Sequence, residues 1–255
     1  MTAGPFASDI PRMIFRTAAR LVWFGFEVGV ILVNYLFTAA WAPKPERRRA
    51  RAAWLHRSCR RHLRIFGCTV NFEGPLPTGG LLVSNHLSYL DILVISSITP
   101  AVFVSKSEVR GWPLFGWLAS LAGTVFIRRA RRADVGPVNR EIESALADGA
   151  LVVVFPEGTS TNGEEVLPFR SPLLEPVATG THPIAVSRVH YEVDGGDARN
   201  DVCYWGEHMF FPHVLRLLGK PAVRATVRFG KFERTTDDRK ELAVQLREAV
   251  LQLRP

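Results

Sequence analysis

A histidine and an aspartate, His86 and Asp91, are the residues whose types and spacing first suggest chemistry in this 255-residue chain. They lie between an apolar, strand-like run at residues 81–84 and an apolar, helix-like run at residues 91–95. A carboxylate in the first helical turn can fold back to accept the Nδ1 proton, which leaves Nε2 free to act as a base toward a hydroxyl. The same spacing also fits a histidine that packs a turn and an aspartate that sits favourably near a helix N-terminus.

A second candidate site follows the most apolar strand-like run, at residues 151–155. There Pro156 ends the strand, Glu157 supplies a carboxylate, and Gly158 allows the backbone to turn sharply. A solvent-exposed turn is the plain alternative. The sequence beyond Gly158 approaches the Gly-x-Ser-x-Gly elbow of hydrolases, but Asn162 stands at the last position, so we do not predict a nucleophilic serine.

The positive charge of the chain is concentrated in one segment. Residues 44–64 contain nine Lys or Arg and one acidic residue, so this segment accounts for the whole net charge of +8. The preceding residues 21–42 are almost wholly apolar, with Glu27 and Asn34 as the strongly polar exceptions. About 20 apolar residues match the thickness of a bilayer core, but a glutamate in lipid is costly.

We therefore expect residues 1–64 to form a membrane-binding helix pair that lies in the interface. In this arrangement Trp23, Trp41 and Trp54 lie near the headgroups and the arginines face lipid, on the cytoplasmic face of the inner or plasma membrane. A spanning helix and a buried helical hairpin remain alternatives. A cleaved signal peptide is disfavoured because the apolar run is long and no small-residue cleavage site follows it. Membrane lipids, and no nucleic acid, are the expected partners.

After residue 64 the pattern changes to short alternating elements. Strand-like runs lie at residues 68–72, 81–84, 101–105, 124–127, 151–155, 183–189 and 223–229, and helix-like stretches at 88–97, 112–121, 138–146, 171–178, 212–218 and 237–253. Ser171 before Pro172 predicts a helix N-cap. The alternation predicts an α/β domain over residues 65–255, a mostly parallel mixed sheet flanked by helices, with ligands near the strand ends.

The cysteines and histidines indicate no further site. Cys59, Cys68 and Cys203 are widely spaced and form no Cys-x-x-Cys pair, so neither a disulfide framework nor a zinc site is predicted. The histidines between residues 182 and 213 match no familiar metal-ligand spacing, and we expect no metal.

Four ordered segments resemble the blocks of the glycerolipid acyltransferases, typified by bacterial 1-acylglycerol-3-phosphate acyltransferase. They are Asn-His-x4-Asp at residues 85–91, the strand at residues 123–129, Phe-Pro-Glu-Gly-Thr at residues 155–159 and the run at residues 183–186. The first and third blocks together, in this order, are specific to that family. The resemblance covers roughly residues 65–230.

The resemblance implies an O-acyltransferase that moves a fatty acyl group from acyl-CoA or acyl carrier protein to the free hydroxyl of lysophosphatidic acid, giving phosphatidic acid. His86 would take the proton of the acceptor hydroxyl as general base, and Asp91 would orient the imidazole. Direct attack on the thioester explains why no nucleophilic serine or cysteine is needed. No metal and no bound cofactor is implied, and the acyl-CoA or acyl carrier protein is a co-substrate.

Further residues are expected to bind substrates. In the second block the family binds acceptor phosphate through basic residues, and in the third block it binds the acceptor. Lys106, just beyond a predicted strand, is a further phosphate contact, and Asn85 is a candidate donor to the oxyanion. The complete expected set is Asn85, Lys106, Arg128, Arg129, Glu157, Gly158, Thr159 and Arg170.

One position departs from the family pattern. Ser160 stands where the third block often continues with an arginine that binds phosphate. Arg170 could replace that charge if the loop between it and Glu157 folds back. The Thr-Ser variant also resembles bacterial relatives that acylate lyso-ornithine lipid, so an acceptor without phosphate is the alternative. A non-catalytic lipid-binding protein and a thioesterase or lipase are the other classes that we consider.

Overall fold

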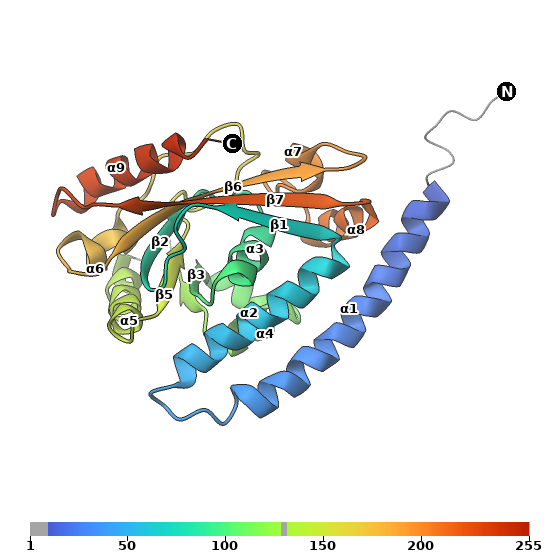
Figure 1. Ribbon diagram of the computed structural model, residues 1–255, viewed down its shortest axis with the longest axis horizontal. Coiled ribbons are helices and arrows are strands. Elements are labelled where there is room, and N and C mark those ends of the chain that lie inside the picture. Colours follow the sequence, from blue (N-terminus) through green and yellow to red (C-terminus); the bar gives the residue numbers. More distant parts are fainter. Residues whose placement is uncertain (1–9, 129–131, 255) are drawn as a thin grey trace.

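One mixed sheet of seven strands organises the part of the chain that the computed structural model describes, residues 10–128 and 132–254 (Figure 1). The strands are β1 (Cys68–Glu73), β2 (Gly80–Ser84), β3 (Val102–Lys106), β4 (Val125–Ile127), β5 (Leu151–Val154), β6 (Ile184–Val193) and β7 (Val223–Phe232). Their spatial order is β1-β7-β6-β2-β5-β3-β4. From β6 to β4 neighbouring strands are parallel, whereas β7 is antiparallel to β6. The predicted mostly parallel mixed sheet is confirmed, and each predicted strand is present.

Helices cover both faces of this sheet. They are α1 (Ile10–Thr38), α2 (Arg47–Ile65), α3 (Leu90–Ile98), α4 (Phe115–Leu121), α5 (Val135–Ala147), α6 (Glu175–Ala178), α7 (Ala198–Asp201), α8 (Phe210–Gly219) and α9 (Arg239–Gln252). Short 3₁₀ turns are η1 (Ser107–Gly111), η2 (Arg132–Asp134) and η3 (Pro172–Leu174). Helices α2, α3 and α8 share one apolar core, and α5, α6 and α9 share the other. Along β2, Leu82 enters the first core and Leu81 and Val83 the second, because successive strand side chains face opposite sides.

The helices differ from the sequence prediction in detail. Helix α4 begins three residues later than predicted because residues 112–114 form a bend and a turn, in which Leu114 has a non-helical φ of +63°. Helix α7 was not predicted, since four residues are too few to produce a helical period. Its N-cap is Asp197, whose side chain accepts a hydrogen bond from the backbone of Arg199. Ser171 does occupy an N-cap position before Pro172, but its side chain makes no capping hydrogen bond.

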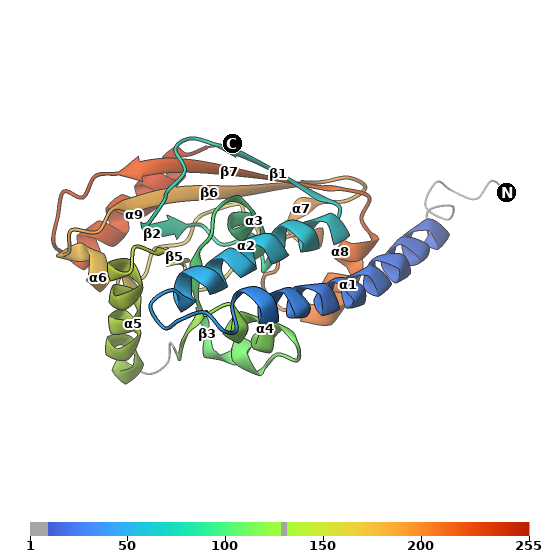
Figure 2. The same cartoon turned by 60° about the horizontal axis from the view of Figure 1, so that its bottom comes forward.

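The two N-terminal helices pack as an antiparallel pair, as the sequence predicts (Figures 1 and 2). Glu27, in the middle of α1, accepts hydrogen bonds from Arg61 at 2.6 and 2.9 Å and from Trp23 at 3.2 Å. These bonds lower the pKa of the Glu27 carboxyl below its ordinary value, with the Arg61 hydrogen bond as the largest cause. A glutamate is thus accommodated in an apolar helix because it faces α2.

Two expectations for this helix pair are wrong. Trp54 does not lie at headgroup depth, because it is 1% exposed and donates its indole N–H to the carbonyl of Ile31 at 2.8 Å. The arginines do not all face outward either. Arg61 is bound to Glu27, and Arg48 lies 2.5 Å from Asp148.

Helix α2 also belongs to the main body of the protein. Leu63, Ile65 and Phe66 are buried in the same core as Leu90 of α3 and Val153 of β5. The expected boundary between residues 64 and 65 therefore divides one continuous core. Within the described residues, α1 is the one helix whose length and composition would allow it to cross a bilayer.

Candidate active site

Four of the expected site residues lie along one edge of the sheet because four parallel strands end there. His86 follows β2, Glu157 follows β5, Lys106 is the last residue of β3, and Arg128 follows β4. The carboxyl ends of adjacent parallel strands form a crevice in which α/β proteins bind ligands. Chain segments far apart in sequence are thereby placed side by side.

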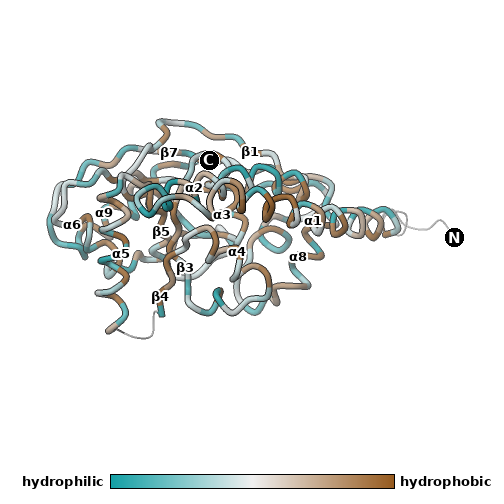
Figure 3. The backbone as a smooth tube through the Cα atoms, turned by 90° about the horizontal axis from the view of Figure 1, so that it is seen from below, coloured by the Kyte–Doolittle hydropathy of each residue, from teal (hydrophilic) through white to brown (hydrophobic). Residues whose placement is uncertain are grey.

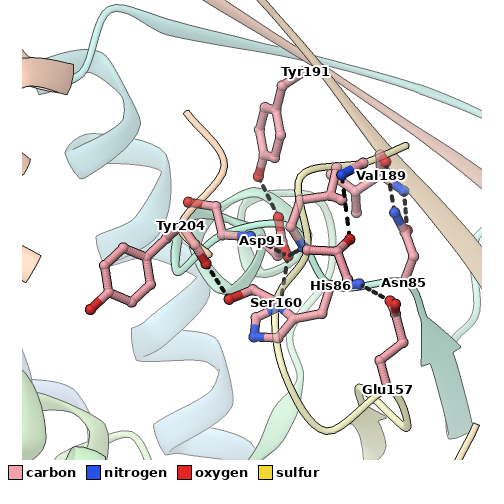
Figure 4. Close-up of polar contacts among 12 residues, drawn as sticks. Asn85, His86, Asp91, Glu157, Ser160, Val189, Tyr191 and Tyr204 are labelled. Atoms are coloured by element: carbon pink, nitrogen blue, oxygen red, sulfur yellow. Dashed lines mark hydrogen bonds and ion pairs between the residues drawn. The ribbon is translucent and has the colours of Figure 1, made fainter. Parts of the chain in front are cut away.

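His86 and Asp91 are in direct contact (Figure 4). Nδ1 of His86 lies 2.8 Å from Oδ2 of Asp91, and the same oxygen accepts the backbone N–H groups of Leu87 at 2.7 Å and Ser88 at 3.0 Å. Because the carboxylate can only accept, Nδ1 carries the proton and Nε2 is left as the basic nitrogen. The sequence allowed Asp91 either to orient the histidine or to stabilise the turn, and the structure shows both contacts. The Asp91 carboxylate accepts the N–H groups of the turn and also fixes the His86 ring.

The ring of His86 is further held by Phe155. The two rings are stacked, with their centroids 4.2 Å apart and their planes 18° from parallel. The side chain of His86 is 22% exposed, whereas that of Asp91 is fully buried. The histidine can therefore be reached from solvent, and its partner cannot.

Tyr191 of β6 is a site residue that the sequence did not reveal. It is 3% exposed and donates its hydroxyl to Oδ1 of Asp91 at 2.8 Å (Figure 4). Burial, together with the charge of Asp91, raises the pKa of the Tyr191 hydroxyl well above its ordinary value, so the group remains a donor. Alternating burial along β6 marks Tyr191 as a core residue, but no local pattern indicates a partner 100 residues away.

Glu157 is turned inward toward backbone groups. It is 2% exposed, and its two oxygens accept the backbone N–H of His86 at 2.7 Å and of Leu167 at 2.8 Å (Figure 4). Removal from water raises the pKa of Glu157 to about 7, and the two backbone hydrogen bonds oppose that rise. The carboxylate therefore joins the loop after β5 to the loop that carries the histidine. Its expected contact with the acceptor stays a prediction.

Asn85 is bound to the backbone of β6. Its Oδ1 accepts the backbone N–H of Val189 at 2.7 Å, and its Nδ2 donates to the carbonyl of Val189 at 3.1 Å. The side chain is 4% exposed. The amide thereby extends the pairing of β2 with β6 and uses one of its two N–H donors, and a role of Asn85 as an oxyanion donor stays a prediction.

The loop after Glu157 folds back and brings Arg170 close to Gly158, which is the arrangement in which Arg170 could replace the missing arginine. The backbone N–H of Arg170 donates to the carbonyl of Pro156 at 2.9 Å. Gly158 has a φ of +77°, and a Cβ there would lie 3.1 Å from Nε of Arg170, so the guanidinium lies against this glycine. Thr159, the next residue, is exposed. A phosphate contact of Arg170 stays a prediction.

Ser160 is tied to a neighbouring loop. Its hydroxyl donates to the carbonyl of Tyr204, in the segment between α7 and α8 (Figure 4). The position at which the family pattern often has arginine therefore holds a short side chain that points toward that segment.

The basic residues expected at the next two strands are placed as follows. Lys106 is exposed at the end of β3. Arg128 is 56% exposed and forms a two-pronged contact with Asp134, at 2.5 and 3.2 Å. The hydrogen bond that Arg128 donates to Asp134 raises the pKa of Arg128 above its ordinary value. Arg129 lies outside the described residues.

An apolar cavity of about 170 Å³ lies beside the loop that carries His86. Its walls include Tyr89, which is part of the His-x4-Asp segment, together with Phe24, Leu55, Phe115 and Phe210. These residues come from four helices and the loop before α3, so no single stretch of sequence predicts the cavity. Its lining suits a hydrocarbon chain.

The thiols in the described region are buried and unpaired. Burial raises the pKa of Cys59, Cys68 and Cys203 to about 12, so each remains protonated near neutral pH. No three His, Cys, Asp or Glu side chains gather as a metal-ligand group within residues 10–128 and 132–254. The expectation of a metal-independent site stays a prediction.

Known proteins share this sequence pattern and this fold. The Acyltransferase family model matches residues 68–186. The lyso-ornithine lipid O-acyltransferase of Brucella abortus is 39% identical over 71% of this chain and 73% of that protein. The 1-acyl-sn-glycerol-3-phosphate acyltransferase of Neisseria gonorrhoeae is 38% identical over 47% of each chain. The crystal structure of the 1-acyl-sn-glycerophosphate (LPA) acyltransferase from Thermotoga maritima shares the fold, with a TM-score of 0.65 at 18% identity, over 96% of this chain and 97% of that one.

Proposed function

Because the chain belongs to the acyltransferase family, we propose that it transfers a fatty acyl group from a thioester donor to the free hydroxyl of a membrane lysolipid. The observation that carries this proposal is the His86–Asp91 contact, which leaves Nε2 as the basic nitrogen at the crevice. The donor is acyl-CoA or acyl carrier protein. The enzyme acts on the cytoplasmic face of a membrane to which α1 and α2 attach it.

The reaction follows from this geometry. Nε2 of His86 takes the proton of the lysolipid hydroxyl while the oxygen attacks the thioester carbonyl. The C–S bond breaks, the ester forms, and the thiolate leaves with the proton that His86 returns. Asp91 stabilises the imidazolium, and Tyr191 with the backbone N–H groups keeps that carboxylate in place. Both substrates must be bound together, so sequential kinetics are expected.

The apolar cavity beside Tyr89 is the proposed site for an acyl chain. Tyr89 lies between His86 and Asp91 in sequence and in the wall of the cavity, so a chain held there would end near the histidine. The apolar walls favour hydrocarbon over headgroup, because an unpaired polar group would lose its hydrogen bonds with water there.

Lysophosphatidic acid is the first acceptor that we propose. Arg170 against Gly158 and Lys106 at the end of β3 supply positive charge at the same edge of the sheet as His86, and Arg128 at the end of β4 adds to it by exchanging Asp134 for the phosphate. Guanidinium groups match phosphate geometrically. The Neisseria gonorrhoeae relative, whose name states this acceptor class, supports the proposal.

Lyso-ornithine lipid is the second candidate, and a specific observation favours it. Ser160 supplies no charge and is bound to the carbonyl of Tyr204, so the third block lacks one phosphate ligand of the family pattern. The Brucella abortus relative, named for this acceptor, matches over a larger share of this chain.

An acceptor panel tests both the reaction and the acceptor. Purified full-length protein is given acyl-CoA with vesicles that contain lysophosphatidic acid or lyso-ornithine lipid, or with soluble glycerol 3-phosphate. We expect thiol release only with a lysolipid, and an acylated lipid as product. His86→Ala and Asp91→Ala should each lower turnover by about 10²–10⁴-fold, the usual contribution of a general base.

His182→Ala is the matched control, because His182 also lies near a carboxylate, Glu143 at 3.1 Å, and has a similarly exposed side chain. It should keep wild-type turnover. Free fatty acid without acceptor would instead identify a thioesterase, and no thiol release would identify a lipid-binding protein. Substantial turnover by His86→Ala would contradict the assigned base.

A further inference from the structure

Helix α8 presents large apolar side chains outward. Phe211 is 60% exposed and Leu215, one turn later, is 45% exposed, while Met209 just before the helix is 71% exposed. The opposite side of α8 is buried through His213 and Leu217. A surface helix normally turns polar residues to water, so exposed apolar residues grouped on one side of a helix mark an interaction surface. We refer to Met209, Phe211 and Leu215 as the α8 face.

Helix α8 is fixed against α1 by two arginines of the apolar N-terminal helix. Arg16 donates to the carbonyl of Gly219 at 2.7 Å, and Arg20 donates to the carbonyls of Leu218 at 2.9 Å and Lys220 at 2.6 Å. Cations at a helix C-terminus satisfy its last carbonyls and its dipole. The arginines therefore hold α8 beside α1.

The helices also approach closely at the same place. A Cβ on Gly219 would lie 2.7 Å from Cγ of Met13, so only glycine fits there without a shift. Phe115 of α4 stacks on Phe24 of α1 at 6.0 Å and contacts Phe210 of α8 at 5.1 Å. Helices α1, α4 and α8 thus meet around one aromatic cluster.

Helix α1, which lies beside α8, also exposes large apolar side chains. On α1, Phe15, Val22 and Phe26 are between 68% and 76% exposed, and on α4 Trp117 is 51% exposed. Figure 3 shows hydrophobic segments of α1 and α8 close to one another. The neighbouring helix α2 adds exposed arginines at residues 57, 60 and 64, whose charge suits anionic headgroups.

The segment before α8 touches both catalytic loops. The backbone N–H of Tyr204 donates to the carbonyl of Leu87 at 2.8 Å, and the carbonyl of Tyr204 accepts the Ser160 hydroxyl. Tyr89 of the His-x4-Asp segment lies 3.0 Å from Nδ1 of His213 in α8. The position of α8 is therefore linked to the position of His86.

We propose that the α8 face inserts into the interface of a phospholipid bilayer beside α1 and holds the active-site crevice at the membrane surface. The bilayer contact would then have two parts, α1 and the α8 face. The hydrogen bonds that Arg16 and Arg20 donate to the C-terminal end of α8 would join them. This inference rests on the proposed function only in taking the acceptor to be a membrane lipid.

Vesicle co-sedimentation of the full chain tests this without acyl donor or lysolipid. The variant Phe211→Ser/Leu215→Ser should bind phosphatidylglycerol–phosphatidylcholine vesicles at least about tenfold more weakly than the wild type, because the apolar area buried in lipid is lost. Val244→Ser on α9 is the matched control, since Val244 is 57% exposed and α9 covers the other face of the sheet. It should bind as the wild type does. Thermal unfolding verifies that each variant is folded.

A fluorescent label gives an independent readout. The described cysteines are buried, so Phe211→Cys or Val244→Cys can be labelled selectively with an environment-sensitive maleimide. Vesicles should shift the emission of the label at residue 211 to shorter wavelength and leave that at residue 244 unchanged. Equal vesicle binding by Phe211→Ser/Leu215→Ser and wild type, or a concentration-dependent shift without vesicles that indicates a second copy on this face, would overturn the proposal. Loss of transferase activity would not affect either readout.

Discussion

At the scale of single residues, the site is held by buried carboxylates with no free oxygen. Asp91 accepts from His86, Leu87 and Ser88 through one oxygen and from Tyr191 through the other. Such a carboxylate cannot rotate without leaving buried donors unsatisfied, and each unsatisfied group costs about 1–3 kcal/mol. The orientation of the imidazole is therefore fixed before any substrate binds, which is how a base becomes effective.

Glu157 gives the site a pH dependence of stability. Its pKa is about 7 in the folded protein against an ordinary value of 4.5, chiefly because it is removed from water. Between these values the folded state keeps a proton that the unfolded state releases, so this group makes the protein less stable as pH rises from about 4.5 to 7. One retained proton corresponds to about 1.4 kcal/mol per pH unit.

The variant Glu157→Gln should remove this pH dependence. Its amide leaves the N–H of His86 or Leu167 without an acceptor, which costs about 1–3 kcal/mol. The stability advantage of the wild type over Glu157→Gln should therefore shrink between pH 5 and 7, as measured by urea unfolding. Glu233→Gln, at an exposed glutamate, is the control and should follow the wild type. Parallel stability curves for wild type and Glu157→Gln would contradict the assignment.

The residue types of the site could be predicted, but their partners could not. His86 and Asp91 are close in sequence, so local spacing sufficed to predict their contact. Tyr191 reaches Asp91 from a strand 100 residues away, and Glu157 reaches the backbone of His86 from 71 residues away. Asn85 looked like a free donor because its pairing with Val189 depends on which strand lies beside β2. The order of the strands is set by the whole sheet and cannot be derived from the residues around Asn85.

At the scale of elements, strands were easier to predict than helix ends and cavities. Strands such as β5 are continuous apolar runs because both faces of a parallel sheet are buried. Helix α7 is too short to show a helical period, and α4 starts only after Leu114, whose positive φ no sequence pattern indicates. The apolar cavity has walls from several helices, so it follows only from their packing.

The pair of Glu27 and Arg61 makes a prediction at this scale. Glu27 is 5% exposed, so Arg61→Ala leaves a buried carboxylate without its main partner. We expect a loss of about 1–3 kcal/mol of stability in detergent, measured by chemical unfolding. In a Glu27→Gln background the same Arg61→Ala change should cost much less, because no buried charge remains. An equal cost in both backgrounds would show that the two side chains do not interact.

At the scale of the whole molecule, the two N-terminal helices differ in how much they contribute to the buried cores. Helix α1 contributes Ile31 and Tyr35 to the small core around Trp54, whereas α2 contributes Trp54 to that core and Leu63 to the main one. Each such core side chain is worth about 2–5 kcal/mol. Two of them approach the whole stability of a typical domain, about 5–15 kcal/mol.

Truncation should separate the two helices. Removal of residues 1–38 should leave a folded but less stable protein with weak vesicle binding, because the core around Leu63 remains. Removal of residues 1–64 should abolish cooperative unfolding. Circular dichroism and thermal unfolding of both truncated proteins measure this difference. A folded protein that lacks residues 1–64 would show that α2 is dispensable for the core.

The hydrogen bonds from Arg16 and Arg20 to the end of α8 affect the order in which contacts can form while the chain is being synthesised. Arg16 and its acceptor Gly219 are 203 residues apart, whereas Glu27 and Arg61 are 34 apart. At about 5–20 residues per second, the ribosome supplies the partner of Glu27 within about 2–7 s but that of Arg16 only after about 10–40 s. The contact between α1 and α2 can therefore form early. Until α8 has been synthesised, Arg16 and Arg20 of α1 remain exposed to solvent or to lipid headgroups. Formation of α8 is then the step at which α1 takes its final place.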